Sequence, residues 1–254
     1  MDLSFDINIS NNYKSQSQII RVLSEKWIAN NMFCPCCGND NILELDNNLP
    51  VADFICDNCG EIFELKSKRG KIGSKIADGA YSTMIERINS ITNPELFVLQ
   101  YTSSYQVTDL TLIPKFFFTP QIIEKRKPLS QDARRAGWVG CNILYREIPE
   151  QGRIGIIKNG ILADKNNIVD TYKNLKKFQN NDIETRGWLF DVLNCINKID
   201  GDVFTLNQVY GYCDLLKQLH VNNNNVHAKI RQQLQILRDK GIIKFMDRGV
   251  YKKL

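Results

Sequence analysis

Two stretches of the chain place hydrophobic residues at intervals of three and four, which is the spacing of an amphipathic helix. Residues 15–30 carry isoleucine, leucine and tryptophan in this pattern, and Ser15 or Ser17 is suited to cap the helix. Residues 74–91 carry isoleucine, tyrosine and methionine in the same pattern. We therefore expect one helix over each stretch.

Shorter hydrophobic stretches are rich in β-branched and aromatic residues, which favour strands. They cover residues 49–56, 61–68, 94–101 and 110–118. Residues 153–164 add two short hydrophobic runs separated by Asn159-Gly160, a dipeptide typical of the tight turn in a β-hairpin. Helices and strands mixed along the chain in this way predict an α/β fold.

A polar, turn-rich segment over residues 175–184 is expected to link two domains, which we place at residues 1–182 and 183–254. The second domain holds three helical patterns followed by a predicted two-stranded hairpin after Gly241. These helical patterns cover residues 188–199, 205–219 and 226–240, with Thr205 a suitable cap for the second and Asn224 or Asn225 for the third.

The composition is that of a folded globular protein. Of 254 residues, 43% are hydrophobic and 24% are charged, which argues against wholesale disorder. No hydrophobic run approaches the roughly 20 residues that a transmembrane helix needs, and the N-terminus lacks the features of a secretion signal. We expect a cytoplasmic protein with no membrane partner.

The positive charge is concentrated at the C-terminus. From Val226 to Leu254 there are eight Lys or Arg and two Asp or Glu, a net charge of +6 that exceeds the +5 of the whole chain. A basic helix followed by a basic hairpin is typical of a winged helix that reads the major groove and holds phosphates. The alternative is a solvated amphipathic helix on a dimerisation domain. The residues expected to contact DNA are His227, Arg231, Gln235, Arg238 and Arg248.

A second basic segment contains paired arginines next to a tryptophan flanked by glycines. Arg134 and Arg135 are suited to contact the phosphate backbone, and Trp138 is suited to stack on a base or to wedge between bases. Trp138 as an ordinary core residue is an equally good interpretation of this segment alone.

Five of the eight cysteines fall between Cys34 and Cys59. Cys34 and Cys37 form one C-x2-C pair, and Cys56 and Cys59 form another, with eighteen residues between the two pairs. Two such pairs supply the four thiolates of a tetrahedral structural zinc site, so we expect one Zn²⁺ here rather than disulfides or free thiols.

The fifth cysteine of this cluster, Cys36, leaves the choice of ligand open, since it can replace a neighbour. We favour Cys37, because pairing it with Cys34 keeps a two-residue gap.

The strands around the second cysteine pair carry three residues of catalytic type. Asp53 interrupts a hydrophobic strand three residues after Pro50, and Glu64 and Lys66 lie two apart on the next strand, so that both project from one face. Two converging carboxylates bind a hard cation such as Mg²⁺, and a lysine beside them can orient a water or take its proton. This is the PD-(D/E)xK pattern of nucleases, although E-x-K alone arises often by chance on exposed strands.

With these motifs the chain resembles the DpnI family of restriction endonucleases, which cut adenine-methylated GATC. The resemblance extends over nearly the whole chain. It is carried by CPxCG, PVADF, FELKSK, DGAY, RKPL, ARRAGWVGCNI and IRQQLQILRDK. It implies a PD-(D/E)xK nuclease core, a mixed sheet flanked by helices, with an inserted four-cysteine zinc knuckle. A small α+β winged-helix domain is implied after it.

The resemblance assigns Asp53, Glu64 and Lys66 to the nuclease centre, and it assigns the two C-x2-C pairs to zinc. We expect a Mg²⁺-dependent type II endonuclease, monomeric in solution, that acts on duplex GATC carrying N6-methyladenine. Asp53, Glu64 and the Leu65 carbonyl are the expected Mg²⁺ ligands. The rival interpretations are a non-catalytic zinc-containing winged-helix regulator of transcription and a structure-specific nuclease that ignores methylation.

Overall fold

The computed structural model describes residues 1–45, 52–90 and 92–254. Pro50 of the PD-(D/E)xK pattern and the last residue of the helix expected over 74–91 lie outside the described residues. Within the described ranges, no helix has both the length and the hydrophobicity that crossing a bilayer requires.

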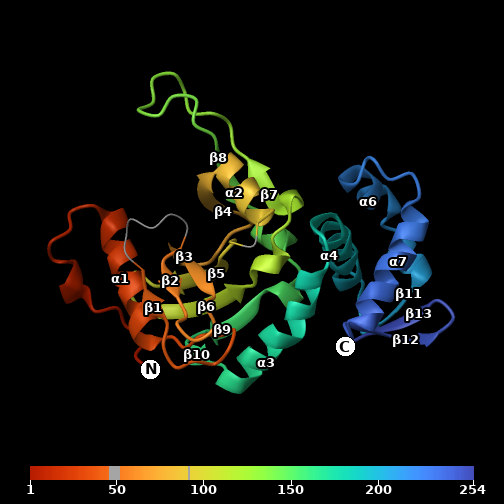
Figure 1. Cartoon of the computed structure of the whole chain (residues 1–254), viewed down its shortest axis with the longest axis horizontal. Coiled ribbons are helices and arrows are strands. Elements are labelled where there is room, and N and C mark those ends of the chain that lie inside the picture. Colours follow the sequence, from red (N-terminus) through yellow and green to blue (C-terminus); the bar gives the residue numbers. More distant parts are fainter. Residues whose placement is uncertain (46–51, 91) are drawn as a thin grey trace.

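A mixed sheet of seven strands forms the centre of the larger, N-terminal part (Figure 1). Strands β3 and β5 pair in parallel, and the other neighbours in the sheet pair antiparallel. In spatial order the strands are β1 (Leu43–Glu44), β2 (Phe54–Ile55), β3 (Ile62–Arg69), β5 (Glu95–Tyr101), β6 (Val107–Ile113), β9 (Ile154–Lys158) and β10 (Ile161–Leu162). The β9–β10 hairpin turns at Asn159 and Gly160, both with positive φ, which confirms the prediction from that dipeptide.

Helices cover both faces of this sheet. Side chains alternate between the two faces along β3, so successive residues of β3 face different helices. Phe63 is fully buried and stacks on Phe97 at 5.0 Å between ring centroids. On the same face, the Ser24 hydroxyl of α1 (Gln16–Asn31) donates to the Ser67 hydroxyl. α3 (Lys165–Lys176) packs on β9, and its Tyr172 reaches β5. Glu64 projects from the opposite face, towards α2 (Tyr81–Ile88).

A second sheet of three strands lies beside α2 (Figure 1). It consists of β4 (Ile76–Ala80), β8 (Gly140–Ile143) and β7 (Ile123–Lys125), in that order. The helix expected over residues 74–91 is therefore wrong in its first part, because β4 pairs antiparallel with β8 and the helix begins only at Tyr81. The loop over residues 126–139 joins β7 to β8 and projects away from the body of the molecule (Figure 1).

The segment expected to be a linker, residues 175–184, is packed instead. It contains the end of α3, the 3₁₀ helix η6 (Lys177–Asn180) and the start of α4 (Ile183–Asn197). Leu175 and Phe178 are buried and Ile183 packs against the core, so hydrophobic side chains anchor this mostly polar stretch. The other 3₁₀ helices are η1 (Ile7–Ser10), η2 (Lys115–Phe117), η3 (Pro120–Ile122), η4 (Tyr145–Glu147) and η5 (Glu150–Gly152).

The C-terminal part is a small domain of helices with a three-stranded sheet. Its elements are α4, β11 (Val203–Thr205), α5 (Leu206–Tyr210), α6 (Cys213–Leu219), α7 (Val226–Asp239), β12 (Ile243–Asp247) and β13 (Val250–Lys253). Thr205 caps α5 with Gln208 in a capping box, as expected, but the helix expected over 205–219 breaks after Tyr210 into α5 and α6. The predicted terminal hairpin is β12–β13.

Within the C-terminal part, α4 is the helix nearest the N-terminal part (Figure 1). One side packs on α7, and Phe190 on another side stacks on Phe117 at 4.5 Å between ring centroids. Asn197 and Gln151 exchange side-chain hydrogen bonds. The observed fold is thus a mixed α/β sheet with flanking helices and a small C-terminal domain, as the sequence predicted.

Candidate functional site

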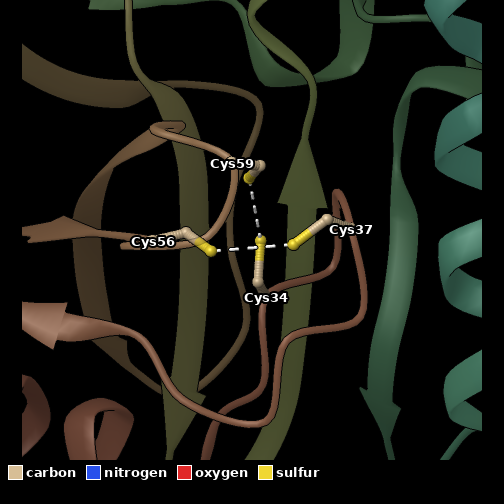
Figure 2. Close-up of side chains that lie close together, drawn as sticks. All are labelled: Cys34, Cys37, Cys56 and Cys59. Carbon is tan, nitrogen blue, oxygen red and sulfur yellow. Dashed lines mark hydrogen bonds between the residues drawn. The ribbon is translucent and has the colours of Figure 1, made fainter.

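Four cysteine sulfurs converge between two loops (Figure 2). The Sγ atoms of Cys34 and Cys59 lie 3.7 Å apart, those of Cys37 and Cys56 lie 3.6 Å apart, and all four lie within 4.8 Å of one another. Four thiol groups at these distances fit a tetrahedral Zn²⁺ as thiolates, which fill every corner of the shell. This cluster is suited to a structural metal, with no position left for a substrate.

The two loops share one backbone hydrogen bond, made by the glycine that follows each cysteine pair. The amide of Gly38 donates to the Cys34 carbonyl and the amide of Gly60 donates to the Cys56 carbonyl, each at 2.8 Å. Both glycines have positive φ, 85° and 71°, which a residue with a Cβ adopts at a cost. Glycine after each pair therefore lets the chain fold back so that both sulfurs of the pair face the same point.

Cys36 does not belong to the cluster. Its side chain is buried, and burial raises the pKa of this thiol well above the usual cysteine range. Its surroundings include Tyr172 and Glu95, on the core side of the loop. The four sulfurs that converge are those of the two C-x2-C pairs, so the geometry agrees with the choice of Cys37.

Asp53 lies against β3, directly before β2. Its backbone amide donates to the Phe63 carbonyl at 2.8 Å, and its Oδ2 accepts from the Leu65 amide at 2.7 Å. The Asp53 carboxylate is therefore fixed beside the backbone of the strand that carries Glu64. The turn over Cys56–Cys59 joins the two strands, so the cysteine cluster helps to hold this register.

Glu64 and Lys66 form an ion pair on β3. The Lys66 Nζ lies 2.6 Å from Glu64 Oε1, and the Arg87 guanidinium of α2 donates to Glu64 Oε2 at 3.2 Å. The side chains are mostly withdrawn from solvent, with exposures of 26% for Lys66 and 16% for Glu64. The two charged residues that the sequence placed on one face of the strand do lie on one face.

A third carboxylate, which the sequence analysis missed, meets the same lysine. The side chain of Asp78 in β4 is 4% exposed, and its Oδ1 lies 2.8 Å from Lys66 Nζ and accepts from the Gly79 amide at 2.7 Å. Its Oδ2 is buried with no hydrogen-bond partner in the described part of the chain. In the sequence, Asp78 stands next to Gly79 within a pattern that predicts a helix. Acidic residues are common in helices, so nothing there marks Asp78 as functional.

Two opposing effects act on the pKa of Lys66. Burial alone lowers it, but the Coulomb attraction of Glu64 and Asp78 and their hydrogen bonds outweigh burial and raise the pKa above the usual lysine range. The two carboxylates therefore stabilise the charged form of Lys66, which is a hydrogen-bond donor.

The oxygen ligands at this centre suit Mg²⁺ rather than a soft metal. Asp53 and Glu64 offer carboxylate oxygens, and Asp78 offers a buried oxygen without a partner. Among the described residues, the four cysteines are the only group of three or more His, Cys, Asp or Glu side chains placed to hold a metal ion. A Mg²⁺ ion here would therefore complete its shell with water, phosphate oxygens or a backbone carbonyl, for which Leu65 remains the predicted donor.

The loop over residues 126–139 presents the predicted basic and aromatic residues. Arg134 and Arg135 are exposed, and the Arg135 guanidinium lies over the Trp138 ring at 4.6 Å from its centroid. Trp138 is half-buried and packs over Gly140, where an added Cβ would meet the indole at 2.7 Å. Trp138 is therefore part of the projecting loop and not of the hydrophobic core.

The outward face of α7 carries the residues expected there. His227, Arg231, Gln235 and Arg238 are exposed, and Arg248 is exposed in the β12–β13 turn. The Arg231 guanidinium donates to the Tyr210 hydroxyl at 2.7 Å, which orients it. The inward face buries Ile230, Leu234 and Leu237.

His220 is buried where α6 ends. Its ring stacks on Trp188 at 3.8 Å between centroids, and its Nε2 lies 2.8 Å from Asp191 Oδ2. These contacts tie the end of α6 to α4.

Comparison with known protein families gives two matches. Residues 1–181 match the model of the Dam-replacing family designated DpnI, and residues 184–253 match that of the Dam-replacing HTH domain designated DpnI_C. The two matches together cover nearly the whole chain.

Proposed function

Because the chain belongs to the Dam-replacing (DpnI) family, whose members are methyl-directed restriction endonucleases, we propose that it hydrolyses both strands of duplex DNA at GATC sites carrying N6-methyladenine. The observation that carries the catalytic half of this proposal is the convergence of Glu64, Lys66 and Asp78, with Asp53 fixed to the same strand. We assign the nuclease to residues 1–182 and a DNA-reading domain to residues 183–254.

In the proposed reaction, a water oxygen forms a bond to phosphorus and the bond from phosphorus to the 3′ oxygen breaks. The attacking water gives up one proton to solvent and the 3′ oxygen takes one from solvent, leaving a 3′-hydroxyl and a 5′-phosphate. Asp53 and Glu64, with the Leu65 carbonyl, would hold Mg²⁺, which would supply a Lewis acid for the charge that develops on the phosphate.

Lys66 has the role of a donor in this scheme. Its ammonium, held between Glu64 and Asp78, orients the attacking water and donates to phosphate oxygens as negative charge develops on them. The hydrogen bond from the Leu65 amide keeps the Asp53 carboxylate in place beside β3. Asp78 acts through Lys66 and is a positioning residue.

We assign recognition of the DNA sequence to two exposed surfaces. The outward face of α7 offers arginine and glutamine for base edges in the major groove, and Arg248 lies at the turn of the wing for a phosphate contact. The loop with Arg134, Arg135 and Trp138 offers an indole for the apolar N6-methyl group or for stacking. With one catalytic centre per chain, the strands are cut in sequence or by two chains that pair briefly on DNA.

Digestion of one plasmid, prepared with and without adenine methylation, tests the proposal. With Mg²⁺ present, the methylated preparation should be cut into the fragments expected for GATC sites, and the unmethylated preparation should stay intact. Equal cutting of both preparations would favour the structure-specific nuclease, and no cutting of either would favour the regulator.

Asp78→Asn should lower the rate of cleavage at saturating DNA by about 10- to 100-fold. The change removes one of the two carboxylates that hold Lys66, and a hydrogen bond to a charged group contributes about 1.5–3 kcal/mol. KM should change little, because Asp78 is buried and does not meet DNA. Single-turnover assays measure the rate, with Asp170→Asn on the exposed face of α3 as the control. If Asp78→Asn cleaved DNA at an unchanged rate, Asp78 would have no role in positioning Lys66 for catalysis.

A further inference from the structure

A small pocket lies where α4 meets the nuclease domain, and none of the roles above uses it. It has a volume of about 160 Å³, and its walls come from α2 and the residues after it, η2, η6 and α4. The lining residues are Ile88, Ser90, Asn93, Lys115, Phe116, Gln179 and Arg186.

Arg186 is the unusual member of this set. It is 8% exposed, and its Nε is buried without a hydrogen-bond partner among the described residues. Among the residues that the structure describes, no carboxylate forms an ion pair with the Arg186 guanidinium. Because arginine stays protonated in proteins, Arg186 places an uncompensated positive charge inside the molecule.

The carboxylate of Asp182 could neutralise Arg186, but it already accepts hydrogen bonds from Thr185. Asp182 attracts Arg186, but burial is the larger effect and lowers the pKa of Arg186 from its usual value. The Asp182 carboxylate caps α4, where its two oxygens accept from the amide and the hydroxyl of Thr185 at 2.8 and 2.7 Å. The capping geometry fixes Asp182 at Thr185, away from an ion pair with Arg186.

The other polar walls add donors without adding a free negative charge. Lys115 forms a close ion pair with Glu61 and lies 3.9 Å from Glu95, so its own charge is balanced. Asn93 is buried and contributes an amide, and Ser90 contributes a hydroxyl. Ile88 and Phe116 form an apolar floor that keeps the local dielectric constant low.

We propose that this pocket binds a small oxyanion of the phosphate class, either inorganic phosphate or the 5′-phosphate at a DNA end. A guanidinium matches phosphate oxygens with two parallel hydrogen bonds, and Lys115 and Asn93 supply donors from other directions. The volume is about ten times the minimum that holds one water, which is enough for a polyatomic ion. Arg186 is too deeply buried for a phosphate within an intact duplex.

Binding of the anion would join the two domains. Arg186 belongs to α4 of the C-terminal domain, whereas Lys115 and Asn93 belong to the nuclease domain. An anion held between them would stabilise the domain contact that the Phe117–Phe190 stack already makes. This inference does not depend on the proposed nuclease activity.

Thermal unfolding of the full chain, without DNA and without added Mg²⁺, tests the pocket. Inorganic phosphate at about five times its Kd should raise Tm by about 2–4 °C relative to chloride at the same ionic strength. Arg186→Gln should lose this rise, and Arg146→Gln, which removes an exposed arginine of η4, should keep it. In phosphate-free buffer Arg186→Gln should be at least as stable as the natural chain, because it removes an uncompensated buried charge.

Two further probes distinguish the sources of the anion. A tetranucleotide with a 5′-phosphate and the same tetranucleotide with a 5′-hydroxyl are compared with inorganic phosphate in the same assay. Protection by phosphate alone assigns the pocket to a free ion, and protection by the 5′-phosphorylated form but not by the 5′-hydroxyl form assigns it to a DNA end. No protection by any probe, equal protection of Arg186→Gln, or marked destabilisation of that variant in phosphate-free buffer would overturn the proposal.

Discussion

Glu64→Gln should lower the rate of DNA cleavage by about 10²- to 10⁴-fold. The substitution keeps the size of the side chain but removes a charge that pairs with Lys66 and is assigned to Mg²⁺. A catalytic metal contributes several kcal/mol of transition-state stabilisation, and each 1.36 kcal/mol corresponds to a factor of ten in rate. Single-turnover cleavage of a methylated duplex measures the effect.

The matched control for this change is Glu86→Gln, an exposed residue of α2 next to Arg87. It should leave the rate within about a factor of two, because an exposed carboxylate contributes little to stability or to catalysis. Glu64→Gln should also fold, since glutamine can still hydrogen-bond to Lys66 or Arg87. A folded Glu64→Gln chain that cuts at the natural rate would show that the metal binds elsewhere.

Cys56→Ser should release zinc and strongly destabilise the nuclease domain. Structural zinc contributes about 10–16 kcal/mol in zinc-finger peptides, and loss of only about 4 kcal/mol would lower Tm by about 8–16 °C. Cys56 directly follows β2 and begins the turn to β3, so the loss should also disturb Asp53 and Glu64. Metal analysis and thermal unfolding measure the two effects.

Two cysteine variants serve as controls for zinc binding. Cys213→Ser changes a half-buried cysteine of α6 and should keep one zinc per chain. Cys36→Ala should also keep its zinc, because the Cys36 sulfur lies outside the converging set. If Cys36→Ala lost the metal, or Cys56→Ser retained it, the assignment of the four ligands would be wrong.

The cysteine cluster and the β3 residues were predictable because their chemistry is local. The two C-x2-C pairs carry their turn glycines beside them, and Glu64 and Lys66 share a face through strand periodicity alone. Asp78 was not predictable, because its position depends on the pairing of β4 with β8, which lies some sixty residues further along the chain.

The errors in the fold have a similar origin. Residues 76–80 have a helical hydrophobic pattern, but the antiparallel partner β8 holds them in a strand. The segment 175–184 is polar in composition, yet Leu175 and Phe178 dock it on the core. Arg186 has no sequence signal at all, because a single arginine in the first turns of a helix is ordinary until its burial is known.

The proposed DNA-reading surfaces fall between these cases. The polar face of α7 followed from helical periodicity, whereas Trp138 was equally consistent with core and loop until its half-burial on the projecting loop was known. Which surface contacts the methyl group depends on the shape of a complex with DNA, which no pattern of residues in one chain determines.

The most direct measurement of the central claim uses Asp53→Ala on one methylated GATC duplex. Binding and cleavage are measured on the same sample, with binding in Ca²⁺ and cleavage after transfer to Mg²⁺. The duplex should be bound by Asp53→Ala within a few-fold of the natural affinity, because Asp53 faces β3 and not the α7 surface, while cleavage should fall below detection. Cleavage by Asp53→Ala at the natural rate would contradict the assignment of hydrolysis to Asp53, Glu64 and Lys66.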